Sequence, residues 1–160
     1  MSRKVHVQLS AGTRGRITAA ELRRVARSVL DAEDVAPAVE VEVVLADEAT
    51  VRELNRLYRG RDEPADVLSF AAMEGEAFTV APDEAPSLGE IVICLPVAEA
   101  QATAAGRAVA GEVAHLLTHG LLHLLAYDHE EDEAESQRMK AREDELLGAL
   151  GYAGQYEHGH

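Results

Sequence analysis

The chain has 160 residues, is 47% hydrophobic and carries a formal net charge of −14. Its length suits one domain with a substantial core, and no run of about 18 apolar residues predicts a membrane span. No secretion-type apolar stretch follows the first residues and Cys94 is the single cysteine, so we expect a cytoplasmic protein without an internal disulfide. We expect a single domain over residues 1–160, with residues 154–160 as a flexible tail.

The negative charge is concentrated in the second half of the chain. Residues 1–70 hold 11 of the 15 basic residues and 12 acidic ones, a net charge of −1, which leaves −13 for residues 71–160. Because phosphate backbones prefer basic surfaces, a nucleic acid would approach the side built by the first half.

The first predicted elements are an alternating strand over residues 4–9, expected at a sheet edge, and a helix that begins after Thr18. Thr18 and Glu21 form a capping box, which is a strong signal for a helix start. The predicted core stripe of this helix comprises Leu22, Val25, Val29 and Leu30.

A second strand and helix follow. In residues 39–45 every second residue is apolar, so one face of a strand is expected to be buried. Asp47 is a good N-cap for a helix that runs to about Tyr58. Gly60 and Pro64 then indicate a loop.

The second half of the chain predicts two short apolar strands, residues 67–71 and 89–95, separated by a loop over residues 73–87. Residues 97–126 read as two helices broken near Gly106. Residues 130–150 form a last helix, for which Gly148 or Gly151 provides the end. This mixture of strands and helices predicts an α/β or α+β fold with one small mixed sheet.

Three histidines, His119, His123 and His129, form the most specific pattern in the chain. Four residues turn a helix by about 400°, so the first two lie roughly 40° apart on one face, where they can reach one ion. His129 joins them only if the helix stops near Ala126 to Asp128. Three protein ligands leave the fourth position of zinc open, as in a catalytic site. We therefore expect one zinc ion per chain, although nickel, cobalt and copper also suit imidazole ligands.

Two neighbours of these histidines are candidates for supporting roles. His115 lies one turn before His119, but its Cα is about 12 Å along the helix axis from that of His123. We therefore favour a role for His115 in orienting a ligand or in packing. Asp128, beside His129, is expected to orient an imidazole N–H or to cap the last helix.

The histidine spacing is similar to the zinc-peptidase motif H-E-x-x-H-x-x-G-x-x-H, with two changes. Gly120 stands where that motif has its general-base glutamate, which weakens a peptidase interpretation. Ala126 stands where it has a glycine. If that position needs a left-handed backbone, alanine costs about 1–2 kcal/mol more than glycine.

The whole segment resembles the YbeY family of bacterial rRNA-maturation endoribonucleases, whose pattern is H-G-x-L-H-L-x-G-Y-D-H. Residues 119–129 match every fixed position except Ala126. Residues 54–70 (LNRLYRGRDEPADVLSF) and 88–93 (LGEIVI) are also similar to family blocks and occur in the family order. The resemblance extends more loosely over nearly the whole chain.

The resemblance implies an α+β, zincin-like fold with one mixed sheet of about four strands packed with about five helices. It also implies a zinc-dependent, single-strand-specific endoribonuclease that acts in ribosomal RNA processing and ribosome quality control. The implied substrate is the 3′ region of small-subunit ribosomal RNA, and the implied partners are single-stranded RNA and the small ribosomal subunit.

Arg59 matches a family arginine that points toward the metal cleft and is needed for activity, so the resemblance implies that it binds the scissile phosphate. By spacing, Arg52, Arg56 and Arg59 share one helix face, and Arg61 follows. Arg56 and Arg61 are candidates for RNA binding, and a solvated basic face is the alternative explanation. Tyr58 is next to Arg59 in the sequence, and it could equally belong to the hydrophobic core.

Two other functions remain open. The first is a non-catalytic ribosome-assembly factor whose metal only holds the helix end to the following loop. It predicts that metal loss lowers stability while Arg59→Ala changes nothing. The second is a metallopeptidase or another zinc hydrolase, against which Gly120 argues. The sequence indicates neither a general base nor an oligomeric state.

Overall fold

The computed structural model describes residues 4–10, 17–71, 87–125 and 133–152. Four strands and five helices lie within these ranges. In chain order they are β1 (Val5–Leu9), α1 (Ala19–Ala32), β2 (Glu40–Ala46), α2 (Glu48–Arg59), β3 (Val67–Ala71), β4 (Ser87–Cys94), α3 (Leu95–Ala105), α4 (Val109–Leu124) and α5 (Glu133–Ala149). None of the described helices is long and apolar enough to cross a bilayer.

The strands form one mixed sheet in the order β1-β2-β4-β3. β1, β2 and β4 are parallel, whereas β3 pairs antiparallel with β4 at one edge. The predicted α+β fold with a small mixed sheet is therefore confirmed, as is the edge position of the first strand.

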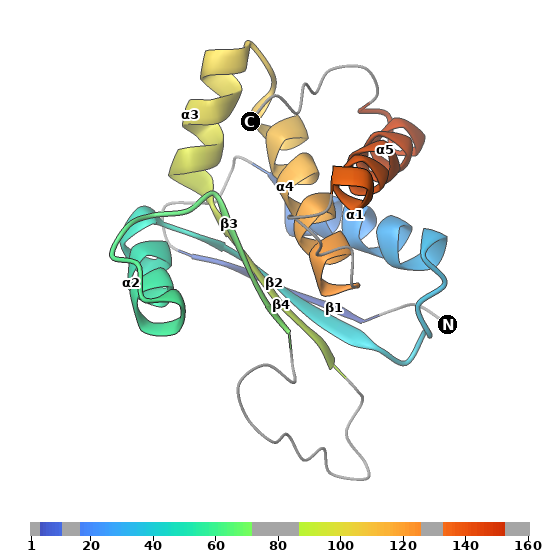
Figure 1. Ribbon diagram of the computed structural model, residues 1–160, viewed down its shortest axis with the longest axis horizontal. Helices are drawn as coiled ribbons and strands as arrows, with labels where there is room; N and C mark the ends of the chain where they lie inside the picture. Colours follow the sequence, from blue (N-terminus) through green and yellow to red (C-terminus); the bar gives the residue numbers. More distant parts are fainter. Residues whose placement is uncertain (1–3, 11–16, 72–86, 126–132, 153–160) are drawn as a thin grey trace, which may run out of the picture.

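Helices cover the two faces of the sheet unequally (Figure 1). α1, α4 and α5 pack on one face, where Val41, Val43 and Leu45 of β2 are fully buried. α2 covers part of the opposite face, where Val51 packs with residues that include Cys94. Burial raises the pKa of the Cys94 thiol, as expected for an inert core cysteine.

Side-chain caps begin the first two helices, as predicted. Thr18 Oγ1 accepts a hydrogen bond from the Glu21 N–H at 3.1 Å, and Asp47 Oδ1 accepts one from the Thr50 N–H at 2.7 Å. The Glu21 carboxylate pairs with Arg24 on its own helix. The two predicted helix starts are therefore confirmed.

The long helical region is divided as predicted. Gly106 ends α3 in the left-handed conformation, with φ at 69°, and α4 begins at Val109. α4 ends at Leu124, just before the predicted stop near Ala126 to Asp128. Ala126 and Asp128 lie outside the described residues, as do most of the predicted 73–87 loop and the 154–160 tail.

The last helix ends where a glycine was predicted. Gly148 lies inside α5, whereas Gly151 follows its end with φ at 95°. The Tyr152 N–H returns to the Leu147 carbonyl at 2.8 Å, which completes the turn. The predicted start at residue 130 lies outside the described residues, in which α5 begins at Glu133.

Gly89 permits the close pairing of β4 with β3. Its φ is 142°, and a Cβ at this position would lie 2.2 Å from the Phe70 carbonyl oxygen. Only glycine fits such an approach. Gly89 thereby helps to hold the edge strand, and with it Ser69, beside α4.

Candidate active site

His119 and His123 converge on the exposed side of α4. Their Nε2 atoms are 2.9 Å apart and their ring centroids are 4.5 Å apart. Two nitrogen ligands of one tetrahedral zinc ion, each about 2.0–2.1 Å from it, lie about 3.3 Å from one another. A small rotation of either ring would produce that geometry. These two residues therefore fit a shared metal ion in both chemistry and position.

The third predicted ligand, His129, lies outside the described residues together with Asp128. Among the ranges that the structure describes, no three His, Cys, Asp or Glu side chains are arranged so that they could hold a metal ion together. The metal site with His119, His123 and His129 thus stays a prediction.

Gly120 brings α4 close to the sheet. A Cβ at this position would meet both Ile91 and Ser69 Oγ at 3.1 Å, a tighter contact than side chains normally make. A glutamate here, as in the zinc-peptidase motif, would push α4 away from β3 and β4. Packing therefore gives a physical reason for the glycine and weakens the peptidase interpretation further.

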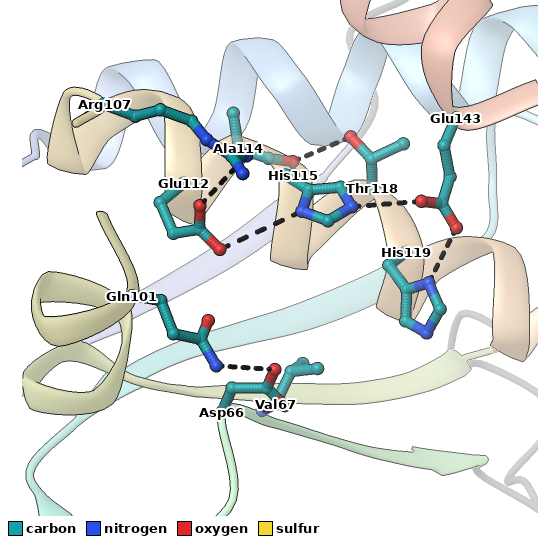
Figure 2. Close-up of polar contacts among 10 residues, drawn as sticks. All are labelled: Asp66, Val67, Gln101, Arg107, Glu112, Ala114, His115, Thr118, His119 and Glu143. Atoms are coloured by element: carbon teal, nitrogen blue, oxygen red, sulfur yellow. Dashed lines mark hydrogen bonds and ion pairs between the residues drawn. The ribbon is translucent and has the colours of Figure 1, made fainter. Parts of the chain in front are cut away.

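Glu143 of α5 is a buried carboxylate that the sequence analysis did not single out. It forms a hydrogen bond with the imidazole ring of His119 (Figure 2). Glu143 Oε2 lies 2.7 Å from His119 Nδ1, and Glu143 Oε1 lies 3.1 Å from His115 Nε2. Burial disfavours the charged carboxylate, but the hydrogen bonds from His115 and His119 prevail and lower its pKa to about 2.

A signal for Glu143 was present in the sequence. Met139 and Leu146 of α5, and Leu150 directly after it, are buried and recur at helical spacing, and Glu143 lies in the same stripe with 3% of its surface exposed. A charged residue in an apolar stripe requires a buried partner. Here the partners are histidines on α4, which the spacing within α5 does not reveal.

His115 is buried between two carboxylates. Its Nδ1 lies 4.0 Å from Glu112, on the side away from Glu143, and Glu112 in turn lies 3.5 Å from Arg107. Burial lowers the pKa of His115, but the two carboxylates more than compensate and raise it to about 9. An imidazolium has no lone pair for a metal, so this environment suits the supporting role over direct ligation.

Arg59 lies at the free edge of the sheet. Its Nη2 donates to the Ser69 carbonyl oxygen at 2.7 Å, and its guanidinium carbon lies 5.0 Å from the centre of the Phe70 ring. Ser69 Oγ in turn donates to the Gly120 carbonyl oxygen at 3.4 Å. The chain of contacts from α2 through β3 to α4 thus connects Arg59 to the residue that follows His119.

Tyr58 belongs to the surface. Its side chain is 64% exposed, so the core alternative is excluded. The ring contacts Phe70 edge to face, with the centroids 5.4 Å apart. Phe70 thus contacts both the exposed ring of Tyr58 and the guanidinium of Arg59.

The other arginines of this region pair with nearby acids. Arg52 donates to Asp62 at 2.8 Å, Arg56 pairs with Glu53 one turn earlier, and Arg61 lies 3.8 Å from Glu63. Because all three pairs are exposed, each adds little to stability. The net charge that this surface offers to a phosphate is smaller than the arginine spacing suggests.

The comparisons with known proteins agree on one family. The family described as Endoribonuclease YbeY matches residues 9–151. The Endoribonuclease YbeY of Roseiflexus castenholzii is 42% identical over 135 residues, which are 84% of this chain and 85% of that protein. That of Pelotomaculum thermopropionicum is 46% identical over 129 residues, 81% of this chain and 84% of that one.

A solved structure agrees in fold. The solution structure of TM1509 from Thermotoga maritima has a TM-score of 0.58 and 26% sequence identity. The match covers 92% of this chain and 91% of the other.

Proposed function

The chain belongs to the YbeY family of endoribonucleases, and we propose on that premise that it hydrolyses phosphodiester bonds of single-stranded RNA at a metal centre on α4. The observation that carries the proposal is the convergence of the His119 and His123 Nε2 atoms, 2.9 Å apart. His119, His123 and His129 would hold one ion, with zinc as the best fit to three imidazoles. A bound ion of this kind supplies a Lewis acid for the phosphoryl oxygen and an activated water.

Arg59 would bind and orient the scissile phosphate. A guanidinium can donate two parallel hydrogen bonds to phosphate oxygens, and it stabilises the charge that develops during cleavage. The contacts of Arg59 with Ser69 and Phe70 support this role, because they hold its side chain at the strand that packs on Gly120. The phosphate would therefore lie between β3 and the histidines.

The aromatic side chains beside Arg59 favour a single-stranded substrate. Bases of single strands stack on exposed aromatic rings, whereas bases within a duplex are already stacked. Tyr58 offers such a ring, and its edge contact with Phe70 fixes the orientation. One base on Tyr58 and the neighbouring phosphate on Arg59 would place the backbone across the edge of the sheet.

The biological substrate that we propose is the 3′ region of small-subunit ribosomal RNA, with a further role in ribosome quality control. The family resemblance supports this choice. The small ribosomal subunit would be the partner that presents the single-stranded RNA.

The direct test is cleavage of an end-labelled single-stranded ribosomal RNA fragment by tag-free, zinc-loaded protein. His123→Ala and Arg59→Ala are measured in parallel, with Arg52→Ala as the control, because Arg52 is on the same helix but pairs with Asp62. We expect losses of about 100-fold or more for the first two variants, which is typical for removal of a group that stabilises the transition state.

The other outcomes separate the alternatives. Equal cutting by all variants would indicate a contaminating nuclease. If neither the wild type nor any variant cuts the RNA, the assembly-factor function becomes the better explanation. If the wild type instead cleaves a denatured protein substrate and a chelator abolishes this cleavage, the result would support a zinc peptidase.

A further inference from the structure

The buried Glu143 lies in a position from which it controls which nitrogen His119 presents to its surroundings. It comes from α5, whereas the histidines lie on α4, so the contact depends on the packing of the two helices (Figure 2). Its two carboxylate oxygens are occupied separately, one by His119 Nδ1 at 2.7 Å and one by His115 Nε2 at 3.1 Å.

The direction of the His119 hydrogen bond follows from the chemistry of its partner. An ionised carboxylate only accepts hydrogen bonds, so His119 Nδ1 carries the hydrogen. In a neutral imidazole the other nitrogen, Nε2, then has the lone pair. Nε2 of His119 is the atom that faces Nε2 of His123 at 2.9 Å. The contact with Glu143 thus leaves a lone pair on the side of His119 where a metal would bind.

Glu143 is itself held in place by a row of buried polar side chains. His115 lies between Glu143 and Glu112, and Glu112 faces Arg107 at 3.5 Å. Glu112, His115 and Glu143 are each at most 5% exposed. A buried network of this kind restricts rotation of the carboxylate, because a new rotamer would leave buried polar groups without hydrogen-bond partners.

We propose that Glu143 is a positioning residue for the metal centre, which fixes the ring orientation and the tautomer of His119 so that Nε2 faces the ion. The inference rests on the metal site of the proposed function and adds a residue outside the histidine motif. Glu143 acts through His119 and does not reach the substrate, since both oxygens are engaged and only 3% of the residue is exposed.

The first test needs no variant and no metal. Long-range ¹⁵N–¹H correlation spectra distinguish the two tautomers of a neutral histidine. In the metal-free wild-type protein we expect His119 to carry its hydrogen on Nδ1. A hydrogen on Nε2 alone would overturn the proposal.

The second test is the zinc affinity of Glu143→Gln, measured at constant pH by competition with a chromophoric chelator. Glutamine keeps the size of the side chain but removes its charge. We expect zinc affinity to fall about 10- to 100-fold, the usual effect of losing a group that orients a metal-bound histidine. The matched control is Glu145→Gln, on the same helix but with a side chain that is 69% exposed, which should bind zinc as the wild type does.

Two further results separate this proposal from the metal site itself. If His123→Ala loses zinc while Glu143→Gln retains wild-type affinity, the metal site stands and the role of Glu143 is wrong. If the wild type binds no zinc, or His123→Ala binds it fully, the metal site fails and the inference fails with it. Circular dichroism of each variant shows whether it is folded. If Glu143→Gln does not fold, the tautomer of His119 in the wild-type spectrum decides whether the proposal holds.

Discussion

Tyr58 is the residue at which the structure most changes the interpretation of the site. Its exposed ring, supported by Phe70 and next to Arg59, is expected to stack on a base of single-stranded RNA. Stacking of one base contributes about 1–3 kcal/mol, so Tyr58→Ala should weaken RNA binding roughly 5- to 150-fold. Fluorescence anisotropy with a labelled single-stranded RNA and metal-free protein measures this without cleavage.

Leu57 provides a matched control for that experiment. It precedes Tyr58 in α2 and is 58% exposed, but it has no aromatic ring. Leu57→Ala should leave affinity within about twofold of wild type, and Tyr58→Phe should preserve it, because the ring is retained. An equal loss in Leu57→Ala and Tyr58→Ala would show that the helix surface, rather than base stacking, binds the RNA.

At the residue scale, local geometry explains what could be predicted. A spacing of four on a helix dictates that His119 and His123 lie on one face, so their convergence was predictable. The partners of Glu143 were not, because they lie 24 and 28 residues away and meet it only through helix packing. The exposure of Tyr58 likewise depends on how α2 packs on the sheet, which the sequence of the helix leaves open.

At the scale of elements, the pairing of β3 with β4 is expected to depend on Gly89. An alanine Cβ there would lie 2.2 Å from a backbone oxygen and would also require φ near 142°. Since backbone atoms cannot move aside cheaply, Gly89→Ala should cost more than about 2 kcal/mol and weaken the β3 edge that carries Ser69. Equilibrium unfolding in urea measures the change in stability.

Gly106 supplies the comparison for Gly89→Ala. It also has a positive φ, 69°, but a Cβ there would meet nothing within 4 Å. Gly106→Ala should therefore cost only about 1 kcal/mol, the conformational penalty alone. If the two variants lose the same stability, steric contact with Phe70 does not contribute and the argument for Gly89 is wrong.

Most boundaries of elements were predictable because their signals are local. Thr18 and Asp47 cap their helices through bonds to residues three positions later, and Gly106 terminates α3 by its own backbone conformation. The order of the strands is different. The antiparallel placement of β3 outside β4 arises from contacts between separate segments, for which neither strand contains a local signal.

At the scale of the whole molecule, Glu21 connects the first helix to the end of the last. Its carboxylate pairs with Arg24 and accepts the hydroxyl hydrogen of Tyr152, which follows α5. The Arg24 hydrogen bond contributes most, and together the partners lower the pKa of Glu21 from 4.5 to about 2. A carboxyl with a depressed pKa in the folded state stabilises the protein above its unfolded-state pKa and loses that effect as the pH falls.

Glu21→Gln should therefore reduce the dependence of stability on pH between 4.5 and about 2. Urea unfolding at several pH values in this window gives the slope, which we expect to be shallower in the variant. Glu53→Gln is the control, because Glu53 forms an exposed pair with Arg56 within α2 that adds little to stability. Identical slopes for wild type and Glu21→Gln would contradict the coupling between α1 and the segment after α5.

Metal binding should also act on the whole molecule. An ion shared by His119, His123 and His129 would join α4 to the segment that leads into α5. α5 also contacts α4 through the hydrogen bond between Glu143 and His119. Since a ligand that binds only the folded state stabilises it, zinc at 100 times its Kd should add about 2.7 kcal/mol. For a chain of this size that corresponds to a rise in Tm of roughly 5–11 °C, which EDTA should reverse.

The variant that decides whether His129 takes part is His129→Ala. We expect it to lose most of the zinc-dependent rise in Tm, because two imidazoles from one helix bind zinc more weakly than three and no longer join α4 to the following segment. His158→Ala is the control and should keep the full rise, since the histidines at the end of the chain are not part of the predicted site. A full rise in Tm with His129→Ala would exclude His129 as a ligand and would require a different third ligand.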